Sequence, residues 1–340
     1  MSEPPILDVR VALWAARLVA PTRDNDPAAA ARLRSAVATD MPDVDAAARR
    51  WARLGGDLPA TRCRVVGRVG WVRANLAALD GAFDPLAEKL STDRRVASRV
   101  VGAQVGALLG LLSTKVLGQY VLPLSAPGSG QLVVVGPNLL ALEDEFGPLA
   151  ADLRRTVLVH EVTHRLQFEG VDWLGDHLRG LLRRYLEHAK LDVATVLESA
   201  GRLPQAVAEA RETGSVQPLF EAVMTAEQRE VIREAQGLMS LLEGHGNAAM
   251  FLGSDGVVDD PGAVRDALEQ RRQDAVAKVL TAVAGLEMKK RQYREGEAFV
   301  RAVVDEVGVD GLNRAFSAPE NLPRPAEVAE PQRWVERVAA

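Results

Sequence analysis

The sequence has one cysteine, few aromatic residues and no large excess of charge of either sign. Cys63 stands alone among 340 residues, so an internal disulfide and a zinc site built from several Cys side chains are excluded. Aromatic residues make up 4% of the chain, and its formal net charge is −5. Because basic residues are scattered among acidic ones, we expect no nucleic-acid partner. The absence of disulfides favours a reducing compartment, and we expect a cytoplasmic protein.

The sequence has little that resembles a targeting or membrane-spanning segment. The start of the chain lacks the basic residues and unbroken apolar run of a signal peptide. One uncharged segment, Val100–Thr114, is apolar but has only about 15 residues, fewer than the roughly 20 that span a bilayer. Within it, Gly102, Gly106 and Gly110 recur at a spacing that lets helices approach closely. We therefore predict a buried helix of a soluble core and no membrane span.

The composition favours helices that pack on helices. The chain is 47% hydrophobic and 26% charged, and Ala, Leu, Val and Arg dominate it, so we predict a mainly α fold. Its length allows one domain over residues 1–340, with a possible helical N-terminal subdomain over 1–115 and a metal-site region over 116–300. The sequence predicts helices over 6–20, 173–191 and 262–304, Ala- and Arg-rich helical structure over 27–53, and either one helix or two short ones over 203–222. Thr225 and Gln228 form a capping box that begins another helix.

Two β-branched runs, residues 118–124 and 131–137, are separated by turn residues and predict a β-hairpin. The hairpin directly precedes the helix that carries the motif described next. It either forms a wall of a substrate cleft, by aligning an extended peptide, or only covers the core. The proline-rich tail from Pro319 to Trp334 predicts an extended segment over the surface.

A predicted helix from Pro148 to Gly170 contains the pattern His160-Glu161-x-x-His164. Two His four residues apart on a helix differ by only about 40° in direction, so both imidazoles can bind one metal ion. Glu161 lies beside them, where it can act on a metal-bound water, as in metal-assisted hydrolysis. The alternative is a pair of core histidines that only pack and form hydrogen bonds.

Zinc in such a site takes a third protein ligand, and the helix after the capping box supplies a candidate. Glu243 lies on an apolar stripe of that helix, where a carboxylate needs a cation or several hydrogen-bond donors. We predict that His160, His164 and Glu243 bind zinc. The other candidates for the third ligand are His245, Glu187 and His177.

These residues predict a hydrolytic mechanism. Glu161 would take a proton from a zinc-bound water and pass it to the leaving amine. His245 or Tyr293 would stabilise the oxyanion, although a purely structural role is the alternative for Tyr293.

The chain resembles the zincin-like metallopeptidase family, within it the branch associated with biosynthesis of the deazaflavin coenzyme. The resemblance rests on segments spread over nearly the whole chain: Gly70–Asn75, Val116–Tyr120, His160–His164 with Gln167 and Phe168, Trp173–Leu178, Glu243–His245, Lys289–Gly296, Asn321–Pro323 and Pro331–Trp334. It implies a mainly helical zincin-like fold, a zinc site and peptidase activity, but no particular substrate. Arg165, directly after the second His, departs from the usual zincin pattern, in which this residue is uncharged.

Two functions follow from the sequence. The first is a zinc-dependent peptidase or amide hydrolase, with a peptide or small amide as its substrate. The second is a non-catalytic metal-binding or scaffold protein linked to deazaflavin-coenzyme metabolism. A metal position open to solvent favours the enzyme, whereas a filled fourth position favours the scaffold.

Overall fold

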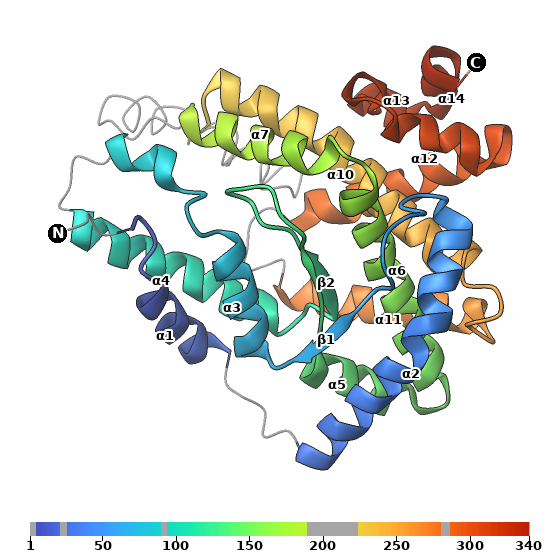
Figure 1. The fold of residues 1–340 in the computed structure, drawn as a ribbon, viewed down its shortest axis with the longest axis horizontal. Helices are drawn as coiled ribbons and strands as arrows, with labels where there is room; N and C mark the ends of the chain where they lie inside the picture. Colours follow the sequence, from blue (N-terminus) through green and yellow to red (C-terminus); the bar gives the residue numbers. More distant parts are fainter. Residues whose placement is uncertain (1–4, 21–25, 90–93, 189–223, 280–285, 340) are drawn as a thin grey trace. The chain divides into compact units, whose positions relative to one another are not determined.

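The computed structural model describes residues 5–20, 26–89, 94–188, 224–279 and 286–339, and is mainly α-helical, with one small sheet (Figure 1). This confirms the predicted fold class. The helices and strands are α1 (Val9–Val19), α2 (Pro27–Ala52), β1 (Cys63–Val66), α3 (Arg68–Ala78), α4 (Arg94–Ser113), β2 (Gly118–Val121), β3 (Gln131–Val135), α5 (Gly136–Phe146), α6 (Ala150–Gly170), α7 (Leu174–Glu187), α10 (Ala226–Leu252), α11 (Pro261–Val279), α12 (Leu286–Leu312), α13 (Pro325–Ala329) and α14 (Pro331–Trp334). The one or two helices predicted over 203–222 lie outside the described residues.

The chain forms two compact units. Unit 1 comprises Met1–Arg179 and Gly246–Ala267, and unit 2 comprises Gly180–His245 and Leu268–Ala340. Helix α10 is continuous across the junction between His245 and Gly246. The domain boundaries expected from the sequence remain predictions.

Unit 1 contains a three-stranded sheet in the order β1-β3-β2. The predicted hairpin is confirmed, because β2 and β3 pair antiparallel, and β1 adds a parallel strand on the other side of β3. The β-branched residues of β3 explain its central place, since Val134 and Val135 are completely buried. Strand β2 is left at an edge of the sheet, beside α6 (Figure 1).

Helix α6 is the central helix of unit 1 and packs against α2, α5 and β2. A short 3-10 turn, Gly147–Leu149, precedes it, so the helix begins two residues later than predicted and ends at Gly170 as predicted. A Cβ at Gly170 would lie 2.6 Å from the backbone nitrogen of Gly55, so a residue without a side chain lets the two backbones meet. Apolar residues are buried along the helix on both sides of the His pair, including Leu153 and Leu166.

Helices α1 and α4 of unit 1 pack side by side through the glycine stripe noted in the sequence (Figure 1). A Cβ at Gly106 would lie 2.0 Å from the carbonyl oxygen of Ala12, and one at Gly102 would lie 2.6 Å from that of Asp8. Among the described residues, α4 is the one helix long and apolar enough to cross a membrane, judged by length and composition alone. The prediction that α4 is a buried helix is wrong for one of its sides, because Val100 and Leu108 are exposed.

In unit 2 the capping box at the start of α10 is confirmed. The Gln228 amide donates a hydrogen bond to Thr225 Oγ1, and the Thr225 amide donates one to Gln228 Oε1, both at 3.1 Å. The tail is not extended as predicted, because α13 and α14 each begin with a proline at a position where no amide donor is needed. Trp334 at the end of α14 is fully buried and donates a hydrogen bond to the Asn321 carbonyl at 2.7 Å.

We expect Gly106→Ala to lower the free energy of unfolding by about 2–3 kcal/mol, because the added methyl group meets the backbone of α1. Gly180→Ala in α7 is the matched control, since a Cβ there meets nothing within 4 Å. Denaturant unfolding of both variants measures the difference. Equal stability of the two would contradict the close packing of α1 on α4.

Candidate metal centre

His160 and His164 lie one turn apart on α6, and their rings meet edge to face with centroids 4.5 Å apart. Their Nε2 atoms are 3.0 Å from each other, so the two nitrogens point to one place. Both residues are only partly buried, in contrast to the apolar residues around them on the helix. This convergence is what a shared cation requires of two imidazoles.

Gln167 fixes the orientation of one of these rings. Its side-chain oxygen lies 2.8 Å from His164 Nδ1, and Gln167 itself is fully buried. An oxygen acceptor there favours a proton on Nδ1, which leaves Nε2 of His164 as the atom with a lone pair for a metal ion. The sequence placed Gln167 in the family resemblance but assigned it no role.

The C-terminal part of α10, which belongs to unit 1, lies directly against the His pair. A Cβ at Gly246 would lie 2.9 Å from Cε1 and Nδ1 of His160 and 3.3 Å from Cε1 of His164. Because α10 is one unbroken helix, Glu243 precedes Gly246 by about one turn and lies on nearly the same side of it. Glu243 itself belongs to unit 2, and its place as the third ligand stays a prediction. Two imidazole nitrogens and one carboxylate oxygen form a donor set that suits zinc and several other divalent ions.

Glu161 is held against the edge strand of the sheet. The backbone amide of Tyr120 donates a hydrogen bond to Glu161 Oε2 at 3.0 Å, and the carboxylate is buried. A Cβ at Gly118 would lie 2.7 Å from Glu161 Cγ, so glycine is required there for the side chain to lie along β2. The acid of the motif is thereby fixed next to the His pair and is not left to solvent.

The hydrogen bond between Tyr120 and Glu161 also determines which backbone amides at the edge of β2 are available to a substrate. The amide of Val135 donates to the carbonyl of Leu117 at 2.8 Å, which sets the alternation of antiparallel pairing, so the amides of Gly118 and Tyr120 face away from β3. Glu161 binds the second of these. An extended substrate therefore cannot use the Tyr120 amide while Glu161 keeps this position.

The unusual Arg165 belongs to a buried network beneath the motif. It donates to Glu169 at 2.8 Å and to Thr61, and Thr61 donates to Asp45. Glu169 also accepts a hydrogen bond of 2.8 Å from the Tyr120 hydroxyl. The positive charge of Arg165 is therefore paired with an acid in the core. This role in the structure explains why a charged residue follows the second His.

Two titratable groups on β1 and β2 stay protonated near neutral pH. Burial, followed by the hydrogen bond to Glu169, raises the pKa of the Tyr120 hydroxyl above its usual value. Burial, followed by the negative charge of Glu161, raises the pKa of the Cys63 thiol to about 12. Neither group supplies an anion to a cation near neutral pH.

The other candidates from the sequence have different surroundings. His245, in unit 2, is fully buried, with its ring 5.2 Å from that of Phe316. His177 packs edge to face on Trp173, and Glu187 is exposed at the end of α7. Tyr293 lies on α12, but its side chain is outside the described part of the structure. The catalytic roles of His245 and Tyr293 therefore stay predictions.

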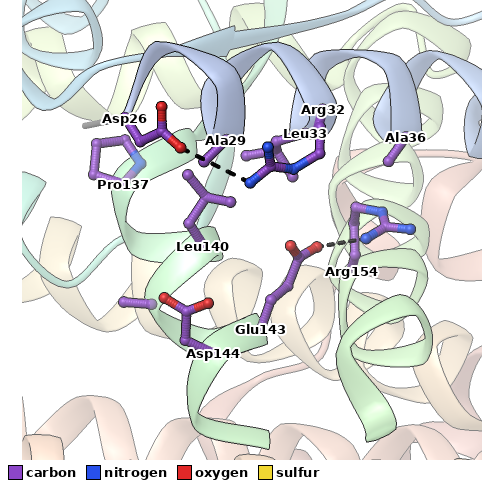
Figure 2. A pocket seen from close by; sticks show the side chains of 11 residues that line it. Asp26, Ala29, Arg32, Leu33, Ala36, Pro137, Leu140, Glu143, Asp144 and Arg154 are labelled. Carbon is purple, nitrogen blue, oxygen red and sulfur yellow. Dashed lines mark hydrogen bonds and ion pairs between the residues drawn. The ribbon is translucent and has the colours of Figure 1, made fainter. Parts of the chain in front are cut away.

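A separate hollow of about 650 Å³ lies between α2, α5 and α6 (Figure 2). Some of its charged groups pair with one another or with neighbours: Arg154 binds Glu143, and also Asp40 at 2.7 Å. A weaker contact of 3.9 Å joins Arg32 to Asp26 across its rim. The His pair does not line this hollow, so the hollow is not part of the candidate metal centre.

Comparisons with known proteins agree with this geometry. The family model for zincin-like metallopeptidases matches residues 7–335. A crystal structure from Chloroflexus aurantiacus, described as a candidate hydrolase with a novel fold, is 28% identical, with a TM-score of 0.69. The match covers 97% of this chain and 98% of that one. No curated protein matches the chain.

We expect Gln167→Met to weaken zinc binding by about 10- to 100-fold, because His164 loses the acceptor that orients its ring. Gln167→Glu keeps an oxygen acceptor at the same position and should retain most of the affinity. Competition for zinc with a chromophoric chelator measures both variants. Equal affinities in Gln167→Met and the native protein would show that Gln167 does not position the ligand.

Proposed function

Because the chain belongs to the zincin-like metallopeptidase family, we propose that it is a zinc-dependent hydrolase of a peptide or a small amide. The observation that carries this proposal is the convergence of the His160 and His164 Nε2 atoms with a carboxylate fixed directly beside them. A pair of histidines that served only to pack the core would not need this neighbouring acid, held in place by the sheet.

We propose that His160, His164 and Glu243 hold the metal ion. When bound, a zinc ion supplies Lewis-acid activation of water near neutral pH. Gln167 sets the tautomer of His164, and Gly246 leaves room for both rings under α10. The network of Arg165, already paired within unit 1, adds no positive charge that would repel the cation.

In the proposed mechanism, Glu161 transfers the proton. The Tyr120 amide binds Oε2, so Oε1 is the oxygen that takes a proton from the attacking water and returns it to the leaving nitrogen. The buried position of Glu161 against Gly118 keeps the carboxylate from swinging away between the two transfers. The remaining edge of β2 is the part of the sheet along which a substrate backbone would align.

We expect Glu161→Gln to retain the metal and to lower turnover by about 10²- to 10⁴-fold, because the amide cannot accept the proton. Glu145→Gln, on the exposed side of α5, changes the same functional group away from the site and serves as the control. Cleavage of a quenched-fluorescence peptide library, together with zinc analysis, gives both readouts. Full turnover in Glu161→Gln would exclude the mechanism, and a zinc-loaded native protein without any hydrolytic activity would favour the scaffold function.

The third ligand is tested separately from activity. We expect Glu243→Ala to weaken zinc binding by at least about 100-fold, since a carboxylate ligand is removed. His177→Ala and Glu187→Ala remove the competing candidates of α7 and should leave the affinity unchanged. If either control lost zinc while Glu243→Ala kept it, the assignment of Glu243 would be wrong.

A further inference from the structure

The exposed large apolar side chains of the described residues are concentrated on two helices. Seven of the eight belong to α1 or α4, and the eighth is Leu252 on α10: Val9, Trp14, Leu18, Val19, Val96, Val100, Leu108 and Leu252. We call the seven side chains on α1 and α4 the α1–α4 surface. Trp14 is 61% exposed and Leu18 is 63% exposed, one helical turn apart. Scattered apolar residues are ordinary on protein surfaces, but such a concentration marks an interaction site.

The charge of this region differs from that of the whole chain. Residues 8–20 and 94–115 contain six basic side chains and one acidic one, whereas the chain carries a net charge of −5. The single acid, Asp8, accepts hydrogen bonds from two amides and caps α1. Arg10, Arg17 and Arg99 are exposed, and the first two share the outer side of α1 with Trp14 and Leu18.

Tryptophan and leucine flanked by arginines are the residues with which a helix lies in the interface of an anionic bilayer. A protein partner with an acidic, apolar groove would need complementary shape, but a lipid surface needs only this combination of charge and apolar area. We propose that the α1–α4 surface binds the surface of an anionic membrane, with Trp14 and Leu18 inserted among the acyl chains and the arginines at the phosphate level.

The packing of α4 favours a position on the membrane over one across it. Its glycine side is closed by the backbone of α1, and Val101 and Val105 on a further side pack into the core that also contains Trp71. Crossing a bilayer would require α4 to leave both contacts. The helix therefore keeps its place in the fold and offers only its outer side to lipid.

The test uses the full chain and sedimentation with vesicles of phosphatidylcholine, with or without phosphatidylglycerol. We expect binding only with phosphatidylglycerol, and weaker binding as salt is raised above about 0.1 M, because exposed charges are screened. Trp14→Glu combined with Leu18→Glu should weaken binding at least about tenfold, and Arg10→Glu combined with Arg17→Glu should also weaken it. Leu252→Glu, which removes an exposed apolar side chain outside the surface, should bind like the native protein.

Circular dichroism and thermal unfolding of each variant separate lost binding from lost folding. The proposal would be overturned if the native chain bound the vesicles and both double variants of α1 bound them equally well. The proposal would also be overturned if the native protein did not bind the vesicles and formed a dimer that Trp14→Glu dissociates. A second copy of the chain would then cover the α1–α4 surface. Retention in the vesicles after an alkaline wash would overturn it in favour of a spanning helix. Zinc content and hydrolytic activity should be unchanged in these variants, so the result does not depend on the proposed function.

Discussion

The candidate site depends on the requirement that polar groups inside a helical core have partners. Helix α6 is buried on most sides, yet it carries two imidazoles, a carboxylate and a guanidinium within six residues. Each of these has a defined neighbour: the imidazoles each other and Gln167, Glu161 the Tyr120 amide, and Arg165 the carboxylate of Glu169. Without such partners, burial would cost several kcal/mol for each group and the helix would not stay in the core.

Local patterns in the sequence were sufficient to predict most of the elements on which the site is built. The helix of the metal motif, the hairpin before it and the capping box of α10 each follow from residue types within a few positions of one another. The pairing of β1 with β3 does not, because it joins Cys63 to Leu132 across nearly 70 residues, and no periodicity reports such a partner. The tail was predicted wrongly for a related reason, since its prolines can either break helices or begin them.

Within the site, the sequence predicted the residues of the chemistry but not those that place them. Two His at helical spacing indicate a cation-binding site, because both positions belong to one helix and its geometry is known from the sequence spacing alone. The roles of Gly118 and Gly246 depend on another element passing within about van der Waals distance, and a glycine in a sequence does not say what approaches it. The same holds for the exposed side of α4: its apolar residues were expected to be buried, but hydrophobicity alone does not distinguish the side that meets the core from the side that is left outside.

The hydrogen bond between the Tyr120 amide and Glu161 gives the strand edge a further property. An outward amide of an edge strand normally exchanges its hydrogen with solvent quickly, because no neighbouring strand protects it. Here a buried carboxylate provides that protection, so the exchange rate of one backbone proton reports how firmly Glu161 is held. The state of the proton carrier can thus be followed by nuclear magnetic resonance without any knowledge of the substrate.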